Sequence, residues 1–79
     1  MARVKYIRTK NNRIIVFSEL QQHSEFIMFE PISAGFISFS VGDDGNISCT
    51  CYGESVTLRL ESMEYDSILA KKQILGWDY

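Results

Sequence analysis

Two cysteines and one histidine are the residues of this chain whose chemistry could support a metal site or a nucleophile. Cys49 and Cys51 are one residue apart, so in a strand they point to the same side with about 6.7 Å between them. That separation is at the far limit for a disulfide and is an awkward bite for one metal ion. A zinc site would need two more ligands, and His23 is the only histidine. For these reasons an enzyme or metal site that uses His23 with Cys49 and Cys51 ranks third among our hypotheses, after the two given at the end of this section.

The carboxylates form no catalytic pattern. Asp43 and Asp44 fall in a short turn, where Asp is favoured because its side chain hydrogen-bonds the nearby backbone. The chain has no ladder of calcium ligands, no glycine-rich phosphate loop and no nucleophile elbow. We therefore expect no enzymatic activity, no cofactor and no metal, and we assign no catalytic residue.

The cysteines lie in the stretch 35–60, which predicts two β-hairpins that share a middle strand. The first turn is 43–45, a three-residue loop with Gly45 at the left-handed position. Such a loop pairs Val41 with Ile47, and the pairs Phe39 with Cys49 and Ile37 with Cys51 follow.

The second turn, Gly53-Glu54, predicts a further strand in which Cys51 faces Val56 and Cys49 faces Leu58. Both turns place the apolar residues on one face of the sheet, so we expect the cysteines to be small core residues. The other face is rich in hydroxyl groups and nearly free of charge, which suits a protein interface, although such residues are also ordinary on a solvated strand. This candidate partner surface comprises Phe36, Ser38, Ser40, Ser48, Thr50, Tyr52, Thr57 and Arg59.

Residues 3–9 and 13–18 predict another hairpin, joined by Lys10-Asn11-Asn12, whose register the sequence leaves open. Residues 19–31 give no clear element. They contain a candidate apolar patch that either plugs one end of the sheet or binds a partner: Phe26, Ile27, Met28 and Phe29. A terminal helix is predicted over 63–75, with Ser62 as its N-cap and Gly76 beyond its end. Its packing face is either the arc of Tyr65, Ile68, Leu69 and Leu75, or a rotated arc that also uses Met63, Ala70 and Ile74.

These elements predict one α+β domain spanning 1–79. Its order is two strands, a short segment, three strands and a helix. The sheet is expected to be antiparallel, curled and about five-stranded, with the helix on its apolar face. At this length a single core buries about 60% of the unfolded chain's surface, so association with another chain would add to stability.

Charge is distributed unevenly along the chain. Residues 1–13 carry five basic and no acidic side chains, whereas the remainder has three basic against ten acidic ones, which together give the net charge of −2. The basic strip is a candidate nucleic-acid surface, with a tyrosine for stacking and the cations for phosphates, or it protects an edge strand from aggregation. It comprises Arg3, Lys5, Tyr6, Arg8, Lys10 and Arg13.

No segment approaches the roughly 20 apolar residues that cross a bilayer, and the run at 14–17 is too short for a signal peptide, so we expect a cytoplasmic protein without membrane contact. The leading hypothesis is a small, non-enzymatic protein-interaction or accessory module, self-association included. Its partner would be another protein or a second copy of the chain. Its size and lack of motifs are typical of bacterial or phage accessory proteins. The alternative is nucleic-acid binding through the basic strip.

Overall fold

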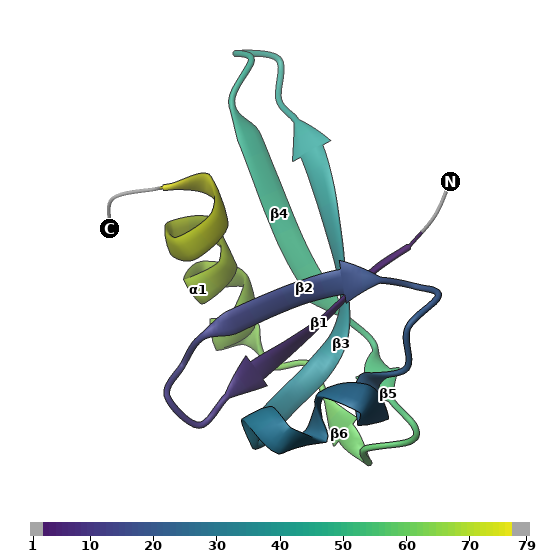
Figure 1. Cartoon of the computed structure of the whole chain (residues 1–79). Helices are drawn as coiled ribbons and strands as arrows, with labels where there is room; N and C mark the ends of the chain where they lie inside the picture. Colours follow the sequence, from purple (N-terminus) through teal and green to yellow (C-terminus); the bar gives the residue numbers. More distant parts are fainter. Residues whose placement is uncertain (1–2, 77–79) are drawn as a thin grey trace.

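The computed structural model describes residues 3–76 and has the predicted α+β class, an antiparallel sheet and a C-terminal helix (Figure 1). The main sheet has four strands in the order β2-β1-β3-β4, and β5 and β6 form a separate two-stranded sheet. The elements in chain order are β1 (Val4–Thr9), β2 (Ile14–Ser18), the 3₁₀ helix η1 (His23–Phe29), β3 (Pro31–Val41), β4 (Ile47–Tyr52), β5 (Glu54–Ser55), β6 (Leu60–Glu61) and α1 (Glu64–Leu75).

Both faces of the main sheet carry a hydrophobic cluster. On the inner face, Leu69 and Ala70 of α1 pack against the sheet residues Tyr6, Ile14, Ile37 and Cys49. On the outer face, Phe26 of η1 and Leu58 and Leu60 of the β5–β6 segment pack against Ile7, Phe17 and Ala34. The uninterrupted apolar run in β2 follows from this arrangement, because that strand contributes to both clusters.

The hairpin formed by β3 and β4 confirms the predicted register. Val41 pairs with Ile47, Phe39 with Cys49 and Ile37 with Cys51. Gly45 has φ +82°, and the Gly42 N–H donates to the Asn46 carbonyl at 2.9 Å. The loop length therefore decided which side chains face each other, as expected for a three-residue turn.

The predicted third strand of the meander is wrong. The chain leaves β4 at Gly53, whose φ is +77°, and β5 pairs only with β6 around the turn 56–59. Within that turn the Ser55 hydroxyl accepts a hydrogen bond from the Leu58 N–H, which favours a turn over a continuing strand. The physical reason is the second cluster: Leu58 and Leu60 cover the outer face, which a fifth strand in the main sheet would leave exposed.

The N-terminal hairpin is formed as predicted, and the structure decides its register. Arg8 pairs with Ile14, and Asn12 adopts the left-handed conformation with φ +62° that closes the three-residue loop. Tyr6 and Arg8 therefore point to the inner face, toward α1, while Lys5 and Ile7 point to the outer face.

Helix α1 begins at Glu64, and its N-cap is Met63, not the predicted Ser62. The Asp66 carboxylate accepts a hydrogen bond from the Met63 N–H at 3.0 Å, so an acid within the first turn satisfies the helix start. The predicted end at Gly76 is confirmed by its φ of +71°. The buried face of the helix consists of Asp66, Leu69 and Ala70, which corresponds to the rotated arc better than to the arc centred on Tyr65 and Ile68.

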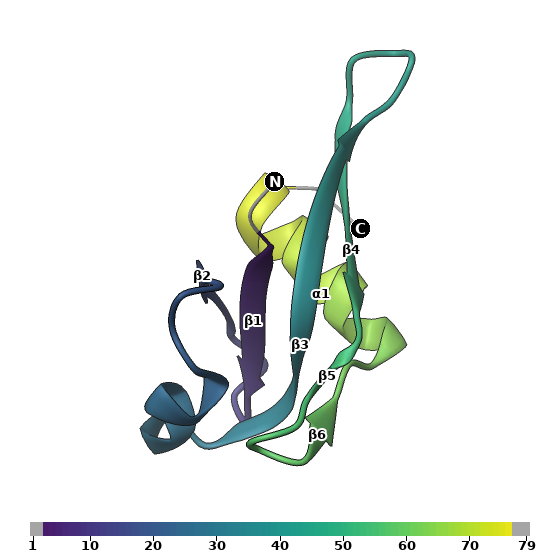
Figure 2. The same ribbon diagram turned by 90° about the vertical axis from the view of Figure 1, so that its right-hand side faces the viewer.

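The hairpin of β3 and β4 extends past the end of α1 (Figure 2). A helix of 12 residues spans about 18 Å, whereas a strand of 11 residues spans about 36 Å. The helix therefore covers only part of the inner face of this hairpin. We call residues 39–47, which form its distal end, the arm.

Candidate interaction surfaces

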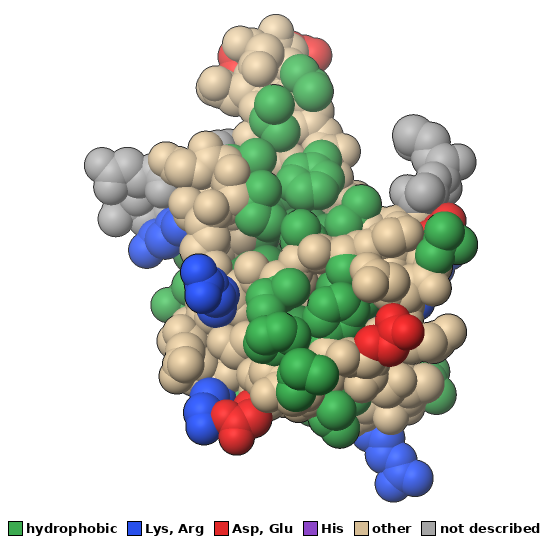
Figure 3. Space-filling view, in the orientation of Figure 1, with side chains coloured by type: hydrophobic (Ala, Val, Ile, Leu, Met, Phe, Trp, Pro, Cys, Tyr) green, Lys and Arg blue, Asp and Glu red, His purple; other side chains and the backbone are tan. Residues whose placement is uncertain are grey.

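The arm exposes apolar side chains on its inner side. Phe39, Val41 and Ile47 are 45%, 71% and 48% exposed, although they lie on the same face as the buried Ile37 and Cys49. Figure 3 shows hydrophobic side chains gathered along the projecting hairpin and continuing toward the middle of the same side of the molecule. Val16 of β2, which is 42% exposed, lies on the same face of the sheet because it pairs with the inward-pointing Tyr6. The arm thus has the sequence pattern of a core strand, but no element within residues 3–76 covers it.

Six of the eight residues of the predicted partner surface lie together on the outer face. They come in three cross-strand pairs: Phe36 with Tyr52, Ser38 with Thr50, and Ser40 with Ser48. The Phe36 and Tyr52 rings are stacked, with centroids 5.8 Å apart. Thr57 and Arg59 are not part of this face, because they lie in the turn between β5 and β6.

The predicted apolar patch is divided between packing and solvent. Phe26 stacks on Phe17 with ring centroids 4.0 Å apart, so it closes one end of the outer cluster. Ile27 and Met28 are 62% and 76% exposed, and Phe29 is also exposed. Only the first residue of the patch thus has the plugging role that the sequence suggested.

The basic strip is also divided. Tyr6 and Arg8 are buried beneath α1, so neither can reach a ligand. Lys10 forms an ion pair with Glu30, and Arg13 is exposed at the β1–β2 turn. Arg3 and Lys5 remain, and both lie beside the outer face, where the Arg3 guanidinium carbon is 5.2 Å from the centre of the Phe36 ring.

A buried polar cluster joins β1 to α1. Asp66 is 0% exposed and accepts hydrogen bonds from the Tyr6 hydroxyl and from the Met63 N–H. The Arg8 Nε atom lies 3.1 Å from Asp66 Oδ1, but neither atom has a hydrogen bond among the described residues, so this contact is an ion pair without hydrogen-bond alignment. Burial, and secondly the hydrogen bond to Asp66, raises the pKa of Tyr6.

Sequence reasoning missed this cluster because its residues are about 60 positions apart. The one available signal was the alternation of Tyr6 and Arg8 in a strand, which places them on the same side. The helix residue opposite them, Asp66, lies in the first turn of α1, where an acid is ordinary because it faces the positive end of the helix dipole. The cluster has no access from solvent, so it can hold α1 in place but cannot bind a substrate.

The cysteines and His23 do not come together. Cys49 is buried and Cys51 half-buried on the inner face, both as free thiols. Burial raises the pKa of Cys51 to about 12 and also raises that of Cys49, so neither is a thiolate at neutral pH. His23 is buried on the outer side, where its Nε2–H donates to the Gly35 carbonyl at 2.9 Å. No cluster of three or more His, Cys, Asp or Glu side chains that could hold a metal occurs within residues 3–76.

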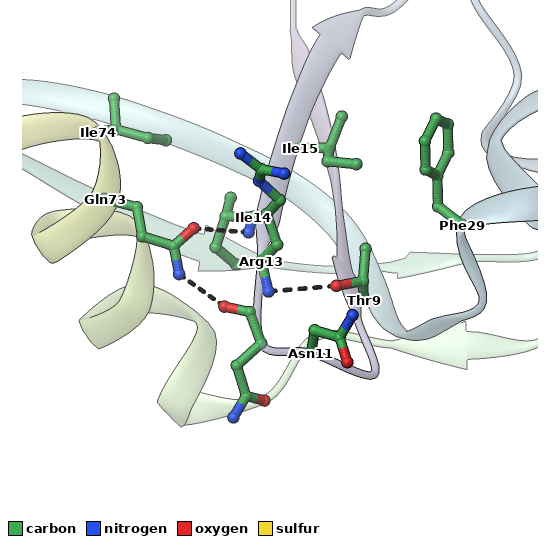
Figure 4. Close-up of a pocket in the computed structure, with 9 residues that line it drawn as sticks. Thr9, Asn11, Arg13, Ile14, Ile15, Phe29, Gln73 and Ile74 are labelled. Carbon is green, nitrogen blue, oxygen red and sulfur yellow. Dashed lines mark hydrogen bonds between the residues drawn. The ribbon is translucent and has the colours of Figure 1, made fainter.

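A shallow depression lies where the β1–β2 turn meets the end of α1 (Figure 4). Gln73 spans it: its Oε1 accepts from the Ile14 N–H at 2.8 Å, and its Nε2 donates to the Asn12 carbonyl at 2.6 Å. On the other side of the helix, the Ser67 hydroxyl accepts from the Cys51 N–H at 2.9 Å. Helix α1 therefore satisfies backbone groups of both edge strands. The depression itself is lined by Thr9, Asn11, Asn12, Arg13, Ile14, Ile15, Phe29, Gln73 and Ile74, which include no carboxylate, histidine or cysteine.

Comparison with protein-family models, with curated proteins and with solved structures finds no match to this chain. Within the described part of the chain, no helix is long and apolar enough to cross a membrane.

Proposed function

We propose that this protein is a non-enzymatic interaction module that forms a homodimer through the inner side of its arm. The supporting observation is the exposure of Phe39, Val41 and Ile47 on a hairpin that projects beyond its own helix. Contiguous exposed apolar side chains are unfavourable in water and are typical of surfaces that another chain covers.

A second copy of the chain suits this surface because its inner side carries no charge. In a two-fold symmetric interface the same surface of both copies meets. A charge on that surface would therefore lie close to the identical charge of the other copy, which is unfavourable. The acidic residues of the arm, Asp43 and Asp44, lie at its tip. Two arms that pack in opposite directions place these tips at opposite ends of the interface, where their charges do not repel.

The size of the surface predicts a weak dimer. Phe39, Val41 and Ile47 are 45%, 71% and 48% exposed, and burying these exposed parts in both copies contributes roughly 5–10 kcal/mol. Association costs at least about 4 kcal/mol in lost translational and rotational freedom. The surplus is therefore at most about 6 kcal/mol, which corresponds to a dissociation constant of tens of micromolar or weaker, so the dimer population is expected to rise with concentration up to the millimolar range.

Sedimentation velocity over a concentration series tests this proposal with a pair of matched variants. Val41→Lys places a charge on the arm, and Val56→Lys places the same charge in the β5–β6 turn, where Val56 is 79% exposed. We expect the wild type and Val56→Lys to dimerise with increasing concentration, and Val41→Lys to remain monomeric. A wild type that stays monomeric at millimolar concentration, or equal dimerisation of both variants, would refute the proposal.

A further inference from the structure

The outer side of the sheet contains a row of aromatic and basic side chains that the strand pairing lines up. Lys5 of β1 pairs with Phe36 of β3, and Phe36 pairs with Tyr52 of β4, so the three side chains lie side by side on one face. Arg3 extends over the Phe36 ring at 5.2 Å. The fold thus joins two surfaces that are far apart in the sequence: the first residues of the basic strip and the aromatic part of the predicted partner surface.

Neighbouring side chains hold Phe36 of this row in place. The His23 ring contacts Phe36 edge-to-face, with centroids 6.0 Å apart, and His23 is itself fixed by its hydrogen bond to the Gly35 carbonyl. Phe36 also stacks beside Tyr52, with an angle of 29° between the ring planes. Phe36 is half-buried, whereas Tyr52 is 41% exposed, so an aromatic surface is available at a defined position.

The charge of this face is positive. Apart from Phe36 and Tyr52, its described side chains along β1, β3 and β4 near the row are one lysine and hydroxyl groups: Lys5, Ser38, Ser40, Ser48 and Thr50. None of them is acidic. The Lys5 ammonium donates to the Gln21 carbonyl at 2.8 Å and keeps further N–H groups for an anion. The Glu19 carboxylate lies beside Arg3 and accepts a hydrogen bond from the Arg3 backbone N–H at 3.1 Å, so the row has two cations and one adjacent carboxylate.

We propose that this face binds single-stranded nucleic acid, with one base on the Tyr52 ring, a neighbouring base on the Arg3 guanidinium plane, and Lys5 at a phosphate. Unpaired bases stack on aromatic rings and on arginine planes, and each stacked base contributes enough to be measured on its own. Bases within a duplex already stack on each other and present only their edges. The row therefore selects single strands over duplexes.

This site does not depend on the proposed dimer. The aromatic row and the arm's apolar side chains lie on opposite faces of the same two strands, so one can be altered without changing the other. Val41→Lys, which we expect to abolish dimerisation, is accordingly expected to leave binding at the aromatic row intact.

Fluorescence anisotropy with a labelled oligothymidylate of about ten nucleotides at low salt tests the proposal. We expect the wild type to bind this strand and to bind the same length of duplex at least tenfold more weakly. Tyr52→Ala should weaken binding about tenfold, whereas Tyr52→Phe, which keeps the ring, should bind as the wild type does. The single phosphate contact of Lys5 predicts a slope of log affinity against log salt of about −0.7, and Lys5→Gln should bring it close to zero. Arg3→Gln removes a stacking plane, so it should weaken binding about tenfold.

Arg13→Gln is the matched control, because it removes the same charge from the β1–β2 turn, away from the aromatic row. It should change neither affinity nor slope. Four outcomes overturn the proposal: no binding by the wild type at low salt, equal affinity for duplex, an equal loss in Tyr52→Phe and Tyr52→Ala, or an equal loss in Arg13→Gln and Arg3→Gln. Far-UV circular dichroism of each variant establishes that it is folded before binding is compared.

Discussion

Replacing Asp66 by asparagine is the single change that we expect to weaken the fold most. The carboxylate is fully buried, and the Tyr6 hydroxyl, the Met63 N–H and the Arg8 guanidinium all converge on it. Asp66→Asn keeps the shape of the side chain but removes its negative charge, and it replaces one acceptor oxygen with an NH₂ donor. Arg8 is only 6% exposed, so its charge cannot be rehydrated without moving α1.

The size of the effect follows from this burial. Removing one partner of a buried ion pair costs about 3–5 kcal/mol, because the other charge stays buried without compensation. A domain of 79 residues has a free energy of unfolding of roughly 4–12 kcal/mol. We therefore expect Asp66→Asn to lose at least a quarter of the stability. If the wild type lies at the low end of this range, folded and unfolded molecules of the variant should be present together.

Urea unfolding followed by circular dichroism measures this loss, with Asp43→Asn as the control. Asp43 is an exposed turn residue, so the same chemical change there should alter the free energy of unfolding by less than about 0.5 kcal/mol. A loss below about 1 kcal/mol in Asp66→Asn would refute the reasoning from burial.

A double-mutant cycle separates the ion pair from the other contacts of Asp66. Replacing both charges, as in Arg8→Met with Asp66→Leu, removes the uncompensated charge that each single variant leaves behind. We expect the double variant to be more stable than the sum of the two single effects predicts, by at least about 1 kcal/mol. Additive effects would show that Arg8 and Asp66 do not interact.

Three further predictions concern residues outside this cluster. Gln73→Ala should lower the free energy of unfolding by about 1–3 kcal/mol in urea titrations, because the Ile14 N–H and the Asn12 carbonyl each lose a partner. Burial lowers the pKa of His23, so the unfolded chain takes up a proton at a higher pH than the folded chain does. The contribution of neutral His23 to the free energy of unfolding should therefore be fully present above about pH 6.5 and fall on acidification below that pH. In thermal unfolding, His23→Gln should reduce this dependence of stability on pH. Cys49 and Cys51 should react slowly with a thiol reagent at pH 7.5 and rapidly in guanidinium, because burial holds both pKa values high; fast labelling of the folded protein would contradict their placement.

Local patterns in the sequence determined those parts of the fold that depend on neighbouring residues. The turn 43–45 was sufficient to predict every pair between β3 and β4, because a hairpin's loop length sets its register. Gly76 was sufficient to predict the end of α1, because a left-handed residue stops a helix. The placement of the cysteines on the inner, helix-facing side also followed from strand alternation.

Only the tertiary structure decided where the covering elements stop and which distant residues meet. Val41 and Cys49 have the same alternation in the sequence, yet Val41 is 71% exposed and Cys49 is buried, because α1 is too short to reach the arm. Asp66 is a core residue because β1 places Tyr6 and Arg8 opposite it, and Arg3 joins Phe36 because β1 lies beside β3. These contacts arise from long-range packing, which the alternation of polar and apolar residues does not encode.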